Sequence, residues 1–151
     1  MADHPKKAYY FGTCLIDISY PEAGMAGIEL LERHGVQVIF PQGQSCCGQP
    51  AHNSGFPAEA KAVARQQIKQ FPKDYPIIVP SGSCAGMLKH HYPEMFADDP
   101  DIDAIKGFSE RVYELTEFLV RVLDVRLEDQ GAPIAITWPS SCHATREMDI
   151  I

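Results

Sequence analysis

The sequence predicts an α/β protein with a mainly parallel sheet and helices on both of its faces. Short β-branched or aromatic runs alternate with longer stretches that have helical periodicity. The run at residues 77–79 is continuously apolar, which is typical of a strand that is covered on both faces. The segments between the predicted strands are long enough for helical crossovers, so successive strands can run parallel.

Local signals place the first elements. An aromatic run predicts a strand at residues 8–11. A helix is expected from Pro21 to Gly35, because small and apolar side chains recur there at three- and four-residue steps. The β-branched and aromatic residues 36–40 predict the second strand, and a second helix follows at residues 58–71. Prolines end that helix before the third strand at residues 77–79.

The second half of the chain predicts three further elements. A short helix is expected at residues 85–91, ending before Pro93. An apolar stripe with helical spacing predicts the longest helix at residues 109–127. Residues 134–137 are expected to form the fourth strand. The stripe consists of Val112, Leu115, Leu119 and Val122.

Composition limits the possible functions. The chain has 151 residues and a net charge of -7, and a nucleic-acid surface would need clustered Lys and Arg instead, so we expect no nucleic-acid partner. No apolar run has the length of a transmembrane span, and residues 1–7 lack the apolar segment of a secretory signal. We therefore expect a cytoplasmic protein with no transmembrane segment. In that reducing compartment, cysteines are expected to be free thiols, metal ligands or redox groups.

Each of the five cysteines follows a predicted strand within a few residues. The carboxyl ends of parallel strands share one edge of the sheet, which is where open α/β folds bind ligands. The adjacent pair lies in a turn at residues 42–50 that glycines and a proline prevent from continuing as a strand or helix. Clustered thiolates require neutralisation, which an iron–sulfur cluster or a zinc ion provides. The five are Cys14, Cys46, Cys47, Cys84 and Cys142.

The spacing of these cysteines resembles the Cys-Cys-Gly cysteine-rich domain family, which includes the cysteine-rich component of heterodisulfide reductase and the iron–sulfur subunits of glycolate and lactate oxidation. Within that family, the chain is most similar to the lactate-utilisation protein A branch, over essentially its whole length. The segments that carry the resemblance are Gly12-Thr-Cys-Leu-Ile-Asp17, Tyr20-Pro-Glu-Ala-Gly24, Ser45-Cys-Cys-Gly-Gln-Pro-Ala-His-Asn-Ser-Gly55, Pro80-Ser-Gly-Ser-Cys84 and Tyr113-Glu-Leu-Thr-Glu-Phe118.

The resemblance implies that Cys14, Cys46, Cys47 and Cys84 are the metal ligands and hold a [4Fe-4S]-type iron–sulfur cluster. Relatives with the fuller motif have a further cysteine at the place of Ser81, so a four-thiol cubane fits this chain better than a non-cubane cluster. The implied function is an iron–sulfur electron-transfer subunit, or the N-terminal half of one, in an L-lactate-oxidising complex that converts lactate to pyruvate. As an oxidoreductase subunit, the chain is expected to need the other subunits of that complex and to be inactive alone.

The resemblance also implies two domains. Residues 1–131 would form a first cysteine-rich domain, and residues 132–151 would begin a second, truncated repeat. Cys142 would then be a ligand that belongs to the second repeat. No catalytic residue is assigned.

Other interpretations compete with this one. A glycolate oxidase iron–sulfur subunit would carry the same cysteines, a structural zinc-binding module would use the same four thiols, and a thiol redox sensor would use Cys46 and Cys47. His52 and Asn53 follow the paired cysteines closely enough to reach a cluster or a carboxylate, although a loop histidine is more often solvated. His90 and His91 end the short helix, where histidines commonly interact with the helix dipole.

Overall fold

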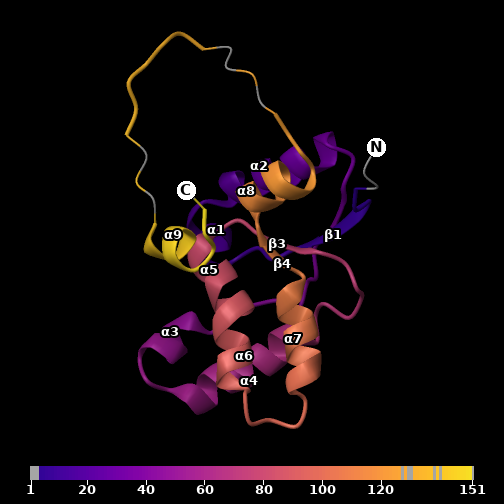
Figure 1. Cartoon of the computed structure of the whole chain (residues 1–151), viewed down its shortest axis with the longest axis vertical. Helices are drawn as coiled ribbons and strands as arrows, with labels where there is room; N and C mark the ends of the chain where they lie inside the picture. The colour runs from indigo at the N-terminus through magenta and orange to yellow at the C-terminus, as the bar shows by residue number, and fades with distance from the viewer. Residues whose placement is uncertain (1–3, 127, 129–130, 138, 140, 151) are drawn as a thin grey trace.

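The computed structural model describes residues 4–126, 128, 131–137, 139 and 141–150. These residues form a parallel four-stranded sheet with the strand order β2-β1-β3-β4 (Figure 1), which confirms the predicted α/β fold. The strands are β1 (Lys7–Tyr10), β2 (Gln37–Ile39), β3 (Ile77–Val79) and β4 (Val112–Glu114). The helices are α1 (Cys14–Ser19), α2 (Pro21–Arg33), α3 (Gln49–Asn53), α4 (Pro57–Ile68), α5 (Gly82–Gly86), α6 (Tyr92–Met95), α7 (Ile102–Glu110), α8 (Leu115–Glu117) and α9 (Cys142–Arg146), with π-helical turns η1 (Met87–His91) and η2 (Phe118–Val122).

Helices cover both faces of the sheet. Because strand side chains alternate between faces, Tyr9 and Ile77 pack with residues of α4 to α7, whereas Tyr10 and Ile78 pack with residues of α2 and η2. All three residues of β3 are fully buried. The continuous apolar character of this strand therefore reflects a layer of helices on each side.

The helices predicted after Pro21 and Pro57 are confirmed as α2 and α4, each of which begins at its proline. The short helices α1 and α3 were not predicted, because neither has an apolar stripe and neither buries a side chain. The Thr13 hydroxyl begins α1 by accepting a hydrogen bond from the Ile16 amide. Within the described ranges, no helix combines the length and the apolar composition that a membrane crossing needs.

The prediction that a short helix at residues 85–91 stops before Pro93 was wrong at both ends. The helical run begins at Gly82 and continues through Pro93 to Met95. The intervening turn η1 has π geometry, in which the Tyr92 amide donates to the Met87 carbonyl. This wider turn lets the chain pass a proline that has no amide proton to donate.

The helix predicted at residues 109–127 was wrong in its first part, because residues 109–110 end α7 and residues 112–114 form β4. Residues 115–122 are helical, as α8 and η2. Val112 pairs with Ile77 in the sheet, and Glu114 then begins α8 from an extended backbone conformation. The Glu114 carboxylate accepts hydrogen bonds from the backbone amides of Thr116 and Glu117, which makes it a helix cap. The predicted apolar stripe is thus divided between a strand, which contains Val112, and the helical segment that follows it.

The fourth strand predicted at residues 134–137 is absent from those positions, since β4 takes that place in the sheet. The described part of this segment runs outside the sheet, and the following helix α9 lies beside α5 (Figure 1). Ile134 and Ile136 are 76% and 74% exposed. An alternating apolar pattern alone does not make a strand, and residues 134–137 pair with none of the four described strands.

Candidate functional site

Four cysteines lie beyond the carboxyl ends of three adjacent strands. Cys14 begins α1 after β1, Cys46 and Cys47 follow β2, and Cys84 lies in α5 after β3. The strand order places β1 at the centre of this group, with β2 on one side and β3 on the other. The chain reverses its winding direction between β1 and β3, and such a switch point is where open α/β sheets form ligand sites.

The thiols lie close enough to interact with one another. The Sγ atoms of Cys47 and Cys84 are 3.5 Å apart, and the Gly48 amide donates to Cys46 Sγ at 3.4 Å. Cys14 interacts with Cys46 through its thiol and with the charge of Cys47. Cys47 and Cys84 are only 2% and 8% exposed, whereas Cys14 is exposed, so the site is open on the Cys14 side.

Burial and mutual contact make these thiols unequal acids. The hydrogen bond from Cys47 lowers the pKa of Cys84, although burial opposes this shift. The same hydrogen bond, together with burial, raises the pKa of Cys47. Burial also raises the pKa of Cys14, and its hydrogen bond to Cys46 adds to the effect. Among these three thiols of the metal-free site, Cys84 is therefore the one whose pKa is lowered, whereas the pKa values of Cys47 and Cys14 are raised.

The four cysteine thiols are soft ligands that suit a positively charged metal centre. Several thiolates confined to one partly buried site repel each other, and bound iron or zinc would remove that conflict. In the part of the chain that the structure describes, no three or more His, Cys, Asp or Glu side chains are already arranged around an ion position. The thiols instead contact one another, as Cys47 and Cys84 do.

The loop that carries Cys46 and Cys47 is held by two glutamines. Gln44 accepts a hydrogen bond from the Gly12 amide and donates to the Tyr10 carbonyl, which ties the loop to the end of β1. The buried Gln67 accepts from the Ser45 amide at 2.9 Å and donates to the Ser45 hydroxyl at 2.6 Å. Sequence reasoning missed both glutamines. Gln67 is fully buried and its amide therefore needs partners, but this burial is visible only in the structure.

Two further features shape the loop. Gly48 has a φ of 87°, a left-handed conformation that favours glycine, and it directly precedes α3. The Tyr92 hydroxyl donates to the Cys47 carbonyl at 2.9 Å, and burial raises the pKa of this tyrosine well above its ordinary value. The backbone on both sides of Cys47 is therefore fixed by groups that sequence reasoning had not singled out.

A pocket of about 360 Å³ opens beside Cys14 and Cys46. Its walls come from the end of β1, from α1 and from the loop after β2. The pocket gives solvent or a small molecule access to the exposed side of the thiol cluster. Its lining residues include Thr13, Asp17, Phe40, Gln42 and Gln44.

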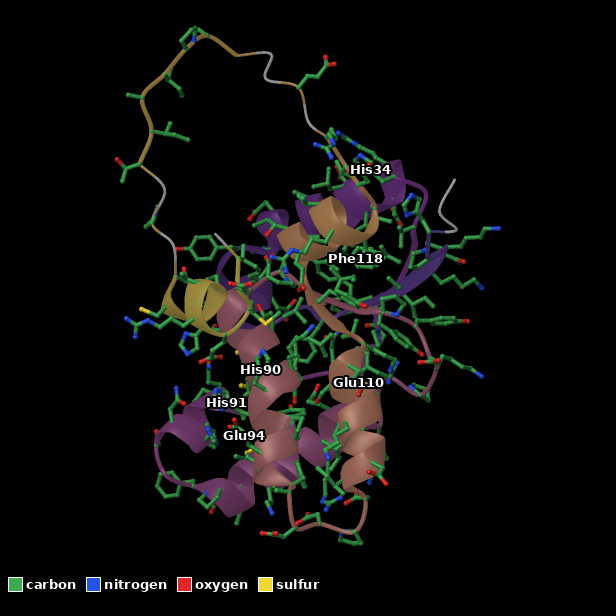
Figure 2. All side chains as sticks on the ribbon, viewed as in Figure 1. His34, His90, His91, Glu94, Glu110 and Phe118 are labelled. Atoms are coloured by element: carbon green, nitrogen blue, oxygen red, sulfur yellow. The ribbon has the colours of Figure 1, made fainter. Side chains whose placement is uncertain are left out.

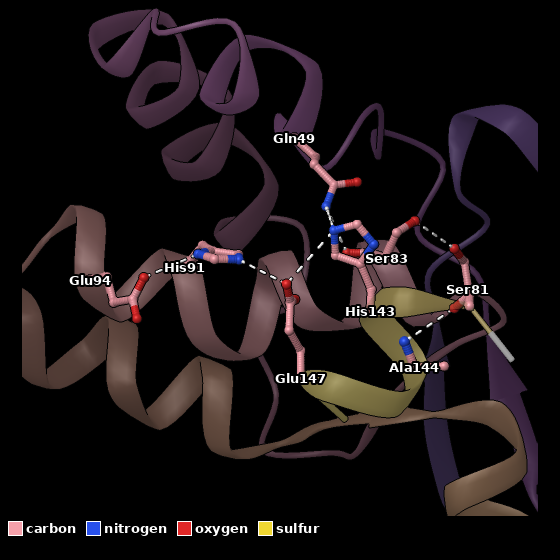
Figure 3. A network of polar contacts seen from close by, with 9 residues as sticks. Gln49, Ser81, Ser83, His91, Glu94, His143, Ala144 and Glu147 are labelled. Atoms are coloured by element: carbon pink, nitrogen blue, oxygen red, sulfur yellow. Dashed lines mark hydrogen bonds and ion pairs between the residues drawn. The ribbon is translucent and has the colours of Figure 1, made fainter. Parts of the chain in front are cut away.

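The histidines considered in the sequence lie in a separate polar network. The His52 and His91 rings are 5.0 Å apart, and His91 lies between Glu94 and Glu147 at 3.1 and 3.4 Å (Figures 2 and 3). This network joins the helical run after α5 to α9. His90 lies on the same helical run (Figure 2).

Cys142 is exposed at the start of α9. Helix α9 packs against α5, where Ala144 lies next to Gly82. His143 of the same helix contacts Gln49 Nε2 at 3.3 Å (Figure 3). The helix that carries Cys142 therefore lies beside the turn that carries Cys84, with its own thiol facing solvent.

Comparison with known proteins gives a family. Residues 8–89 match the model of the CCG family, described as a cysteine-rich domain, which confirms the resemblance seen in the sequence. The chain is 48% identical over 147 residues to "Lactate utilization protein A" of Geobacillus kaustophilus (strain HTA426), an alignment that covers 95% of this chain and 60% of the relative. It is 42% identical over 145 residues to "Lactate utilization protein A 2" of Bacillus cereus (strain Q1), with the same coverage.

A third relative, "Lactate utilization protein A" of Geobacillus thermodenitrificans (strain NG80-2), is 48% identical over 143 residues, which cover 93% of this chain and 59% of the relative. The chain thus spans about 60% of the length of the curated relatives it matches. No solved structure matches the chain.

Proposed function

Since the chain belongs to the CCG cysteine-rich domain family, we propose that it holds an iron–sulfur cluster of the [4Fe-4S] type and serves in electron transfer. The observation that carries this proposal is the convergence of four thiols from three strand ends on one site. The proposed ligands are Cys14, Cys46, Cys47 and Cys84. A bound cluster would supply one-electron redox chemistry.

The surrounding residues have defined parts in this proposal. Cys47 and Cys84 hold the buried side of the site, where little water competes with the protein for the sulfurs. Cys14 holds the exposed side, beside the pocket through which a redox partner gains contact. The Gly48 amide donates to Cys46 Sγ and would stabilise negative charge on that ligand.

The proposed pathway is the oxidation of L-lactate to pyruvate. Support comes from the relatives, which are named for lactate utilization. Removing two electrons from lactate requires a hydride or electron-pair acceptor, and a single one-electron cluster is not such an acceptor. The chain is therefore proposed to act with partner subunits as an oxidoreductase component that is inactive alone. Glycolate is the competing substrate.

Metal analysis of anaerobically prepared protein tests the cluster. We expect bound iron and sulfide with a broad visible band near about 400 nm. Serine substitution at each proposed ligand should remove most of the iron, because serine keeps the size but lacks the soft thiolate. Cys142→Ser is the matched control and should retain full iron content. Equal loss from Cys142→Ser would place a fifth thiol in the site and contradict the proposed ligand set.

One observation favours a structural zinc site as the second candidate. Zinc–thiolate bonds of about 2.3 Å in a tetrahedral site place the sulfurs roughly 3.8 Å apart, close to the 3.5 Å between Cys47 and Cys84. Colourless protein that contains one equivalent of zinc would support a structural zinc site and contradict the proposed electron-transfer function.

Growth experiments test the pathway separately. Deletion of the full-length gene should abolish growth on lactate, and a copy with Cys14→Ser should fail to restore it. Undiminished growth of the deletion strain on lactate would contradict the pathway. A defect confined to glycolate would transfer the proposal to that substrate.

A further inference from the structure

Thr13 has an unusual backbone conformation directly before the proposed ligand Cys14. Its φ is 48° and its ψ is 137°, whereas a residue that caps a helix normally has a negative φ. A β-branched side chain is crowded at positive φ, so this conformation is strained. Such strain persists only where the neighbouring structure fixes the residue, and it is concentrated at functional sites.

The chain before Thr13 is fixed by two contacts. The Gly12 amide donates to Gln44 Oε1 at 2.9 Å, and Gln44 in turn donates to the Tyr10 carbonyl. The Phe40 ring covers Gly12 so closely that a Cβ added to this glycine would lie 2.9 Å from Phe40 Cε2. The segment that follows β1 therefore has little freedom to relieve the strain at Thr13.

The chain after Thr13 is fixed by α1. The Thr13 hydroxyl accepts a hydrogen bond from the Ile16 amide at 3.3 Å, and the Thr13 carbonyl accepts one from the Asp17 amide at 3.0 Å. Thr13 is only 4% exposed, so water competes little for these bonds. Because both neighbouring segments are held, the backbone angles of Thr13 set the direction in which α1 leaves the sheet.

The direction of α1 determines where the Cys14 thiol lies. Cys14 is the first residue of α1, and it lines the pocket of about 360 Å³ together with Thr13 and Cys46. A change of Thr13 to an ordinary negative φ would turn α1 and carry Cys14 away from Cys46. The strained conformation therefore keeps together two cysteines that follow different strands.

We propose that Thr13 is a positioning residue that holds the Cys14 thiol beside the Cys46 loop and thereby slows the loss of iron from the bound iron–sulfur cluster. This inference rests on the proposed function. A ligand side chain that is already held in place loses less conformational freedom when it binds, so it dissociates less readily. Thr13 is not itself a ligand and acts on the cluster through Cys14.

The test is the rate at which a chelator removes iron from the complete chain after anaerobic assembly of its cluster. Thr13→Gly should raise this rate about tenfold, because glycine permits the positive φ but neither caps α1 nor restricts its direction. Thr13→Val keeps the side-chain shape, lacks the hydroxyl and should show a similar increase. Thr13→Ser keeps the hydroxyl and should release iron at the wild-type rate.

Ser141→Ala is the matched control. The Ser141 hydroxyl caps α9 by accepting a hydrogen bond from the Ala144 amide at 3.1 Å, so this variant loses the same kind of helix cap. It should release iron at the wild-type rate. Urea unfolding of the metal-free variants measures the accompanying changes in stability. If the role of Thr13 were only structural, Thr13→Gly would relieve the strained φ and retain its iron.

Each contrary result overturns the inference in a recognisable way. A wild-type rate of iron release in Thr13→Gly would show that Thr13 does not position Cys14, and this variant decides the question even if Thr13→Val does not fold. Rapid release from Thr13→Ser would exclude the hydroxyl as the group that holds α1. Equally rapid release from Ser141→Ala would assign the effect to a general loss of helix caps. A wild-type chain that takes up no iron would instead refute the proposed function.

Discussion

Gly82→Ala is expected to detach α9 from the body of the protein. A Cβ atom at position 82 would lie 2.8 Å from Ala144 Cβ and 3.0 Å from Ala144 Cα, where ordinary contacts are 3.4–4 Å. The obstacle includes backbone atoms, so a side-chain rotation cannot relieve it. Helix α9 must therefore move as a unit or leave the surface of α5.

The energetic effect can be estimated from what α9 anchors. Met148 follows this helix, is 4% exposed and packs in the larger core cluster. Complete burial of such a side chain contributes about 1.5–3 kcal/mol. Replacing glycine by alanine also restricts the unfolded chain and returns about 0.4–1 kcal/mol. The net loss of unfolding free energy should be about 0.5–2.6 kcal/mol.

Hydrogen exchange of residues 142–150, combined with urea unfolding, measures this effect. We expect faster exchange in that segment and unchanged protection of β1 and β3. Gly107→Ala is the control, because position 107 lies in α7 with no neighbouring atom within 4 Å of an added Cβ. It should stabilise the protein by about 0.5–1 kcal/mol. Wild-type protection of residues 142–150 in Gly82→Ala would refute the argument that close packing on Gly82 holds α9.

Three further predictions concern the sheet and the cysteine loop. Burial, and secondarily the charge of Glu114, raise the pKa of Tyr10 from 10.0 to about 12. The contribution of Tyr10 to the free energy of unfolding should therefore be complete below pH 10 and fall by up to about 2–3 kcal/mol as the pH rises towards 12. Urea unfolding at each pH should show this decline in the wild type and not in Tyr10→Phe. Gln67→Met leaves the Ser45 amide without its partner and should cost about 1–3 kcal/mol in the same assay, whereas wild-type stability would show that water replaces the glutamine. Gly48→Ala forces a side chain into a left-handed backbone and should cost about 1–2 kcal/mol and slow iron uptake, and an unchanged melting temperature would contradict this account of the turn.

The sequence was sufficient to predict the fold class and the placement of the cysteines because both depend on strong local patterns. The continuous apolar run at residues 77–79 predicts a strand that is covered on both faces. Pro21 and Pro57 begin helices because the proline ring fixes a backbone angle that suits the first helical position. Because the carboxyl ends of parallel strands lie at the same edge of a sheet, the predicted parallel order also places Cys14, Cys46, Cys47 and Cys84 at that edge.

The rest depended on contacts between distant residues. Val112 has the spacing of a helical core residue, and only its pairing with Ile77 makes it part of a strand. Ile134 and Ile136 have the alternation of a strand but lie outside the sheet, exposed to solvent. The amide groups of Gln44 and Gln67 became recognisable as loop supports only through partners that lie far away in the sequence.

The order of the strands also constrains how a metal centre can be put together. The proposed ligands are spread from Cys14 to Cys84, and the thiols meet only after β2 and β3 have paired on either side of β1. A local Cys-x-x-Cys run can capture iron while the chain is still unfolded, but this arrangement cannot. With the proposed ligand set, the apoprotein would fold first, as a slow-forming parallel sheet, and would then take up metal through the side where Cys14 is exposed.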